Sequence, residues 1–227
     1  MIIAIDGPAG SGKSSTAKAV AARLGIVYLD TGAMYRAITL KGLRKGIPFS
    51  DDAALEKIMQ ETRITFEGTP PDTKIFMDGE DVSQIIRGDE VTKNVSDYCA
   101  RGVVRKSLVD QQRLIASGRS VVADGRDIGT VVFPKADLKI FMVASVEERA
   151  RRRQKDFASM GVQKSLEELA EDIKIRDHKD STRANSPLLK AQDALEMDTT
   201  GMTLEEQINF IVQKATEFLN NGNTRTL

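Results

Sequence analysis

The chain has few of the residues that mark disulfide-rich or metal-binding proteins. Among its 227 residues are one cysteine, Cys99, one histidine, His178, and no tryptophan, and aromatic residues make up only 5%. A single cysteine cannot form an intrachain disulfide, and a lone histidine does not make a metal site. We therefore expect Cys99 to be a small buried apolar residue and assign no role to His178.

An excess of charge of one sign and long hydrophobic runs are also lacking. The 33 basic residues balance 33 acidic ones, so bulk charge gives no reason to expect a nucleic-acid or membrane partner. No run approaches the roughly 18 apolar residues that a membrane span requires. The first residues, 1–6, lack the basic segment and the length of a signal peptide. We expect a cytoplasmic protein with a packed core.

Five short apolar segments predict the strands of a parallel sheet. Each is bounded by turn residues or by a helical pattern, as strands buried on both faces are. Helical patterns such as Lys13–Leu24 lie between or after them, and this alternation predicts an α/β domain with helices flanking the sheet. The predicted strands are Ile2–Asp6, Ile26–Leu29, Ser120–Asp124, Leu138–Val143 and Ala194–Met197.

Two further patterns refine this outline. Between residues 63 and 82 the chain reads as two short strands, Ile64–Glu67 and Lys74–Met77, with a candidate third strand at 80–82. Turn residues separate them, so we predict a small antiparallel sheet inserted into the parallel core. Capping boxes, in which a hydroxyl and a carboxylate three residues apart satisfy each other's backbone N–H groups, mark three later helix starts. They are Ser145/Glu148, Ser165/Glu168 and Thr203/Glu206.

The most specific local pattern directly follows the first predicted strand. Residues 7–14 read GPAGSGKS, a complete G-x-x-x-x-G-K-[S/T] match that leads straight into a helix. In such a P-loop the backbone N–H groups surround a polyphosphate, and the positive end of the helix dipole faces it. We predict bound ATP, with Lys13 bridging its β- and γ-phosphates. The predicted nucleotide-binding residues are Gly7, Pro8, Ala9, Gly10, Ser11, Gly12, Lys13, Ser14 and Ser15.

Two oxygen ligands for Mg²⁺ are predicted beside this loop. The Ser14 hydroxyl occupies the position that ligates the metal in P-loops of this type. Asp124 ends another apolar strand, and an acid at such a strand end lies beside the phosphates in P-loop proteins and orients Mg²⁺ or its waters. We therefore expect ATP and Mg²⁺ as cofactors, with Ser14 and Asp124 as metal ligands.

The remaining residues distinguish between classes of P-loop protein. The Asn-Lys-x-Asp motif with which GTPases read guanine is absent, and a motor ATPase is usually larger. A small-molecule kinase needs arginines outside the P-loop to neutralise the transferred phosphoryl group. Arg149, Arg152 and Arg153 share one face of a predicted helix through their i, i+3, i+4 spacing, whereas Arg151 points elsewhere. The arginines thus favour a phosphotransferase.

With these residues assembled, the chain resembles the bacterial cytidylate kinases, which move the γ-phosphate of ATP onto CMP or dCMP. The resemblance covers about residues 2–215, and the inserted hairpin at 63–82 also fits the family. The segment DGRDIGTVVFP is its most specific part, because other P-loop kinases do not share it. The motifs are IDGPAGSGKS (5–14), DTGAMYR (30–36), VVADGRDIGTVVFP (121–134), SVEERARRR (145–153) and IKIRDHKDSTR (173–183).

The resemblance implies how the acceptor nucleotide is bound. A carboxylate would accept from the N4 amino group of cytosine while an arginine donates to N3, and uracil, which inverts both groups, would be rejected. The residues matching the acceptor site are Thr31, Tyr35, Arg36 and Arg126 for the phosphate, Ser96, Arg105 and Asp127 for cytosine, and Arg176 and Asp180 for the ribose. The residues expected to act in transfer are Lys13, Arg126, Arg149, Arg152, Arg176 and Arg183.

The resemblance also implies an organisation. A P-loop kinase core (about 1–30, 101–148 and 184–227) would carry a monophosphate-binding region (about 31–100) and a mobile lid (about 149–163). We expect a monomer that acts on CMP, dCMP and ATP by direct in-line transfer in pyrimidine metabolism. Two alternatives stay open: another monophosphate or metabolite kinase, of the adenylate or shikimate type, and a nucleotide-binding regulatory module without catalysis.

Overall fold

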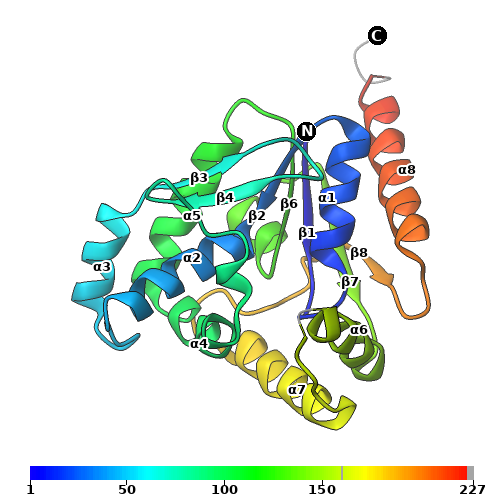
Figure 1. Cartoon of the computed structure of the whole chain (residues 1–227). Coiled ribbons are helices and arrows are strands. Elements are labelled where there is room, and N and C mark those ends of the chain that lie inside the picture. Colours follow the sequence, from blue (N-terminus) through cyan, green and yellow to red (C-terminus); the bar gives the residue numbers. More distant parts are fainter. Residues whose placement is uncertain (160, 224–227) are drawn as a thin grey trace.

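The computed structural model describes residues 1–159 and 161–223. Residue 160 of the expected lid and residues 224–227 of the expected core lie outside the described residues. The centre is a five-stranded parallel sheet in the order β2-β6-β1-β7-β8 (Figure 1). All five predicted strands are confirmed, with shifts of at most one residue. They are β1 (Ile2–Asp6), β2 (Val27–Asp30), β6 (Val121–Gly125), β7 (Leu138–Val143) and β8 (Leu195–Asp198).

Helices cover both faces of this sheet. Successive residues of a strand point to opposite sides, so β1 contributes side chains to both faces. Ile3 and Ile5 of β1 pack in one cluster with α1 (Lys13–Leu24) and α8 (Leu204–Asn223). Ala4, between them, belongs to a second cluster on the other face. The helices of that second cluster are α2 (Thr31–Arg44), α3 (Asp52–Glu61), α4 (Asp89–Cys99) and α5 (Gly102–Ala116).

The predicted inserted sheet is also confirmed. β3 (Ile64–Glu67) pairs with β4 (Lys74–Met77), and β4 pairs with β5 (Glu80–Asp81), in both cases antiparallel. The inward side chains of this sheet, Ile75 and Met77, are buried in the second cluster. The insertion therefore shares the core of the parallel domain, and a short 3₁₀ turn, η1 (Ile85–Arg87), leads from it into α4.

Two helices form a separate hairpin below the sheet, α6 (Val146–Ser159) and α7 (Leu166–Thr182) (Figure 1). Ala150 of α6 packs with Leu169 and Ile173 of α7 in a small cluster of their own. The expected lid thus corresponds to most of α6 and the turn after it, and α7 packs along it as a support. A hairpin with its own core can change its position as a unit.

Two of the three predicted capping boxes are complete. Both hydrogen bonds form at Ser165/Glu168 and at Thr203/Glu206. The box at Ser145 is wrong in one half: the Ser145 hydroxyl accepts from the Glu148 amide, but the Glu148 carboxylate accepts from Arg152 Nε at 2.9 Å. A charge-assisted hydrogen bond to a guanidinium is the stronger one, so the glutamate turns away from the helix start.

Candidate active site

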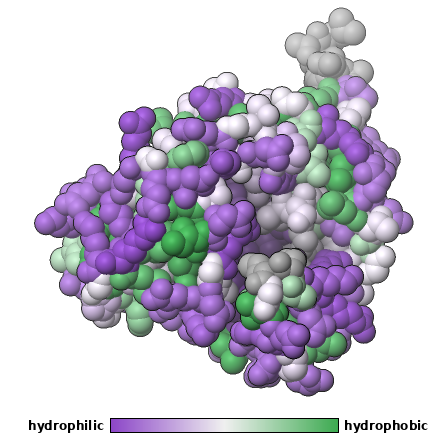
Figure 2. All heavy atoms as spheres, viewed as in Figure 1, coloured by the Kyte–Doolittle hydropathy of each residue, from purple (hydrophilic) through white to green (hydrophobic). Residues whose placement is uncertain are grey.

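A cavity of about 790 Å³ lies at the edge of the sheet where β1, β2 and β6 end. Its walls come from the P-loop, the start of α2, the segment after β6, and helices α6 and α7. Figure 2 shows that this face of the molecule is hollowed near its centre. In parallel α/β sheets the loops that follow the strands converge at this edge, so ligands bind there.

The P-loop has the conformation that the motif predicts. Gly10 and Gly12 adopt φ angles of 78° and 92°, in the region that favours glycine. Lys13 is 5% exposed, and its Nζ donates to the Pro8 carbonyl at 2.6 Å and to Ser11 Oγ at 3.3 Å. Burial lowers the pKa of Lys13. The ammonium lies inside the curve of its own loop, where phosphate oxygens would stabilise its charged form.

Ser14 and Asp124, the two predicted metal ligands, are in direct contact. Ser14 Oγ donates to Asp124 Oδ2 at 2.7 Å, and Tyr28 Oη donates to Oδ1 at 3.0 Å. Burial raises the pKa of Asp124 to about 6, and repulsion from Asp30 adds to the effect. A hard cation beside this carboxylate would oppose both effects, so the oxygen donors fit Mg²⁺.

The protein alone offers few further ligands for such an ion. No group of three or more His, Cys, Asp or Glu side chains that could hold a metal occurs within residues 1–159 and 161–223. In kinases Mg²⁺ is usually bound by one or two carboxylates together with the phosphates of the substrate. The pair Ser14 and Asp124 matches that mode, in which the nucleotide supplies part of the coordination.

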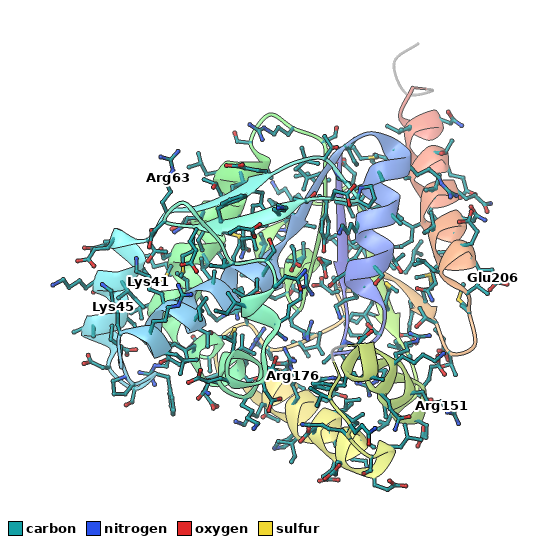
Figure 3. The ribbon with its side chains drawn as sticks, viewed as in Figure 1. Lys41, Lys45, Arg63, Arg151, Arg176 and Glu206 are labelled. Carbon is teal, nitrogen blue, oxygen red and sulfur yellow. The ribbon has the colours of Figure 1, made fainter. Side chains whose placement is uncertain are left out.

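A narrow recess of about 60 Å³ adjoins the main cavity. Arg36, Arg126 and Arg176 line both spaces and therefore mark their boundary. In Figure 3 Arg176 lies near the middle of the molecule, between α4 and α6. Every residue that the sequence analysis assigned to the acceptor lines the recess. These are Thr31, Tyr35, Arg36, Ser96, Arg105, Arg126, Asp127, Arg176 and Asp180.

Several polar atoms in the recess are buried without a hydrogen-bond partner among the described residues. A buried polar group left unpaired costs about 1–3 kcal/mol, so a cluster of them indicates the place of a polar ligand. Burial and repulsion from Arg126 lower the pKa of Arg176 to about 9. Burial likewise lowers that of Arg36 to about 10. The unpaired atoms are Tyr35 Oη, Arg105 Nε, Arg176 Nε and Arg183 Nη2.

Two carboxylates hold three of the arginines of the recess in place. Asp127 accepts a hydrogen bond from Arg105 and lies 3.8 Å from Arg183 Nη2. Asp180 accepts from Arg126 Nε at 2.8 Å and lies 4.0 Å from Arg183 Nη1. These pairs fix the guanidinium groups before any ligand contact is made, and fixed donors bind a phosphate or base with less loss of side-chain entropy.

The arginines of α6 differ in their surroundings. Arg149 Nη1 donates to the Ala9 carbonyl of the P-loop at 3.2 Å and to Asp177 at 2.6 Å. It lines neither the cavity nor the recess, so it connects α6 to the P-loop and to α7. Arg152 lines the cavity and donates to the carbonyl and hydroxyl of Thr199, after β8, at 2.6 and 3.0 Å.

The other two arginines of this run lie on opposite sides of α6. Arg153 lines the cavity and stacks over the Phe157 ring at 5.5 Å. Burial lowers its pKa. Arg151 is 64% exposed and lies at the outer edge of the molecule (Figure 3). The i, i+3, i+4 spacing therefore identified the inward side of the helix, and Arg153 is a further candidate for contact with ATP.

Sequence reasoning overlooked three buried residues of the site. Tyr28 and Asp6 each bind a segment more than 90 positions away in sequence, through Asp124 and through the amides of Ile128 and Gly129. The Thr199 hydroxyl donates to the carbonyl of the P-loop residue Ser11 at 3.1 Å. For Asp6 a signal existed, since an acid ends the strand directly before the P-loop. No local pattern marks Tyr28 or Thr199.

Three comparisons with known proteins agree with this geometry. The family model described as cytidylate kinase matches residues 3–217. The chain is 49% identical over 93% of both chains to a cytidylate kinase of Pediococcus pentosaceus. It is 47% identical to that of Listeria welshimeri over 96% of this chain and 97% of the relative.

A solved structure supports the fold. The chain aligns with a protein of Eubacterium ventriosum described as uncharacterized, with a TM-score of 0.51, 13% identity, and coverage of 94% of this chain and 97% of the other. At that identity the likeness concerns the fold alone. The match to the family model, over residues 3–217, includes both the P-loop and the arginine-lined recess, and the curated relatives cover more than 90% of the chain. The chain therefore belongs to the cytidylate kinase family.

Proposed function

We propose that this chain transfers the γ-phosphoryl group of ATP to CMP and dCMP, giving CDP and dCDP. The observation that carries the proposal is the recess beside the P-loop cavity, where four buried donors have no hydrogen-bond partner among the described residues. Arg36, Arg126 and Arg176 stand where the two spaces meet. A phosphate placed at that boundary contacts guanidinium groups from both sides, as a phosphate passing between two nucleotides must.

The donor nucleotide belongs in the larger cavity. The P-loop amides and Lys13 bind the ATP phosphates, and Ser14 and Asp124 would hold Mg²⁺ together with those phosphates. A bound Mg²⁺ would supply neutralisation of the negative charge that develops during transfer. Arg152 and Arg153 reach the same cavity from α6. Arg149 holds α6 against the P-loop through the Ala9 carbonyl, so its part is to position the lid.

The acceptor belongs in the recess and at its boundary. Its phosphate would contact Arg36 and Arg126, and cytosine would lie between Asp127, Arg105 and Ser96. Asp127 accepts from the N4 amino group while Arg105, whose Nε has no hydrogen-bond partner within the described residues, donates toward N3. The recess has a volume of only about 60 Å³, so we expect its walls to separate when a pyrimidine enters.

The reaction needs no general base in this arrangement. The phosphate of CMP is already ionised at neutral pH, so its oxygen can attack the γ-phosphorus directly, in line with the departing ADP. Positioning and charge neutralisation then provide the catalysis. Arg176 lines both spaces and is the residue best placed to follow the phosphoryl group. Arg183 would act from the recess side, and closure of residues 149–163 would exclude water.

An ADP-release assay with ATP, Mg²⁺ and a panel of acceptors tests the proposal. We expect ADP to form with CMP and dCMP and much more slowly with UMP. Release only with AMP or with shikimate would favour a kinase of another type, and tight ATP binding without release would favour a regulatory module. All residues given a role come from one chain, so we further propose a monomer, acting in the cytoplasm. Size-exclusion chromatography with light scattering tests the monomer.

A further inference from the structure

Asp6, the last residue of β1, makes contacts that none of the roles above uses. Its side chain is buried, with 5% of the residue exposed. Oδ1 accepts from the Ile128 amide at 2.8 Å, and Oδ2 accepts from the Gly129 amide at 2.7 Å. Each carboxylate oxygen thus binds one of two consecutive amides. Such a two-point contact fixes both the position and the orientation of the peptide between them.

The segment held in this way begins directly after the predicted base-reading residue. Asp127 precedes η2 (Ile128–Val132), a single wide turn in which the Asp127 carbonyl accepts from the amides of Val131 and Val132 at 2.8 and 3.1 Å. A single turn has little stability of its own. The contact with Asp6 anchors the amino end of this turn, at the residues that orient the Asp127 side chain.

Glycine at position 129 leaves space beside this contact. A Cβ added to Gly129 would lie 3.1 Å from Lys139 Cδ and 3.4 Å from Asp6 Oδ2. A side chain here would therefore crowd Lys139 and come into van der Waals contact with the carboxylate. The arrangement also has an energetic cost, because burial raises the pKa of Asp6 to about 6 in spite of both hydrogen bonds. An ionised carboxylate at this buried position is therefore an energetically costly way to stabilise a turn.

Asp6 also joins the two halves of the site. The residue after it, Gly7, opens the P-loop, and a Cβ on Gly7 would lie 2.1 Å from the Met142 carbonyl oxygen, so only glycine allows the backbone to pack this closely against β7. We propose that Asp6 is a positioning residue for acceptor recognition, holding the backbone of residues 127–129 so that Asp127 meets the cytosine. The inference rests on the proposed role of Asp127 in reading the base.

A mutant cycle on acceptor preference tests this inference. The ratio of kcat/KM for CMP to that for UMP is measured for the wild type, Asp6→Asn, Asp127→Asn and the double variant. Asn at position 6 keeps one acceptor and loses the other, so we expect the ratio to fall about tenfold, the effect of roughly one lost hydrogen bond to a charged group. The KM for ATP should stay within about twofold. In the Asp127→Asn background, Asp6→Asn should lower the ratio no further.

Two more variants complete the experiment. Gly129→Ala keeps the carboxylate but crowds it and Lys139 from the side of the amide, so it should lower the preference in the same direction, even if Asp6→Asn fails to fold. Asp137→Asn is the matched control, because Asp137 also accepts from a backbone amide of β1, that of Ile2 at 2.6 Å, on the exposed side of the molecule. Its preference for CMP should equal that of the wild type.

The outcomes separate this inference from the proposed function. If Asp127→Asn lowers the preference but Asp6→Asn and Gly129→Ala do not, Asp6 has no part in acceptor recognition. If kcat/KM fell equally for CMP and UMP in both variants, the role of Asp6 would be only structural. An unchanged preference in Asp127→Asn would remove Asp127 from the base reader, and the inference with it, while the kinase activity itself would stand.

Discussion

The P-loop and the acceptor recess bind similar chemical groups but are built in different ways. The P-loop is eight consecutive residues, 7–14, and most of its ligand contacts would come from backbone amides whose direction is set by glycines and by the start of α1. The recess takes its side chains from α2, α4, α5, α7 and the segment after β6. One half of the site is therefore local, and the other depends on the whole fold.

The difference extends to how charge is stabilised. In the P-loop a single buried lysine is held by the Pro8 carbonyl and Ser11. In the recess, arginines are held by two buried carboxylates, and several donors have no partner within the described part of the chain. A backbone cradle suits any triphosphate, because amides read no base. Placed side chains can distinguish one base from another, so specificity belongs to the recess.

Replacement of Lys13 should have the largest effect on turnover and should impair the donor half of the site while leaving CMP binding intact. Lys13→Ala removes the only ammonium of the P-loop motif, so kcat should fall by about 10²–10³-fold, as when a major charge-stabilising group is lost. The Kd for CMP should change little, because Lys13 does not line the recess. Steady-state assays of ADP formation measure kcat, and calorimetric titration with CMP measures the Kd.

The control for this variant is Lys18→Ala. Lys18 lies on α1, one turn beyond the P-loop, and lines a neighbouring cavity of about 540 Å³ between α1 and the inserted sheet. The substitution removes the same type of side chain from the same helix, and its turnover should equal that of the wild type. Near-normal turnover in Lys13→Ala would contradict the assignment of the P-loop.

Arg176 tests whether the two halves meet where the structure suggests. Arg176→Ala should lower kcat/KM for CMP by about 10²-fold, since the guanidinium lines both the cavity and the recess. It should not lower the melting temperature, because burial lowers the pKa of this group to about 9 and its Nε has no partner within the described residues. Lys174→Ala, on the exposed side of α7, is the control. A fall in stability that matches the loss of activity would point to a structural role.

The sequence predicted the donor half more completely than the acceptor half, for a physical reason. A P-loop needs only strand, glycines, Lys13, Ser14 and a helix in immediate succession, and each is visible in the sequence. The sheet followed for the same reason, because its strands are short and mostly apolar segments bounded by turn residues or helices. The residues of the recess were assigned from the resemblance to the family. Nothing in the spacing of Tyr35, Arg105 and Asp127 alone brings them together, since that requires the order β2-β6-β1 and the packing of α2 on α5.

The errors of prediction have different origins. Helices α2 to α5 were not predicted individually, although the buried residues of α3 and α4 follow helical spacing, for example Leu55, Ile58 and Met59 in α3. The half of the Ser145 capping box that fails does so because Arg152 competes for Glu148. Tyr28 escaped notice because its partner, Asp124, follows 96 residues later. The contact of Tyr28 is a long-range one between buried polar groups, which no local pattern records, whereas the pair of Glu148 and Arg152 is a local one at i, i+4.

Asp124→Asn should separate stability from activity within the donor half. Burial raises the pKa of Asp124 to about 6, well above its usual value of 3.8, so the folded state binds a proton more tightly than the unfolded one. The ionised carboxylate therefore destabilises the fold at pH 7, and this penalty disappears as the pH falls through 6 towards 4. The neutral amide should raise the free energy of unfolding by about 1–2 kcal/mol at pH 7.

Denaturant unfolding at pH 7 and at pH 4 measures this effect. The gain should shrink at the lower pH, where the wild-type carboxyl is also protonated in the folded state. Turnover at pH 7 should nevertheless fall, because the proposed metal ligand is weakened. A variant less stable than the wild type at pH 7 would show that the hydrogen bonds from Ser14 and Tyr28 outweigh the cost of burying the charge.

Tyr28→Phe should have the smallest effect and sharpen the comparison furthest. Tyr28 is 6% exposed and its ring packs among the residues under α1, so phenylalanine preserves the packing. Only the hydroxyl that donates to Asp124 Oδ1 at 3.0 Å is lost. Because Ser14 still holds the other oxygen, we expect a loss of only about threefold in kcat/KM for ATP, below the effect of one full hydrogen bond. The Mg²⁺ concentration for half-maximal rate should rise.

Tyr98→Phe provides the matched control. Tyr98 is 3% exposed and its hydroxyl donates to the Ile47 carbonyl, so the same substitution removes a hydroxyl hydrogen bond from a buried ring that lines neither the cavity nor the recess. Its dependence on Mg²⁺ should match that of the wild type. If both variants lost activity equally, the effect of Tyr28 would be one of general stability. If only Tyr28→Phe changes the dependence on Mg²⁺, then side chains from distant parts of the chain also orient the donor half. In that case the P-loop itself is formed locally, but the orientation of Asp124 depends on a residue 96 positions away.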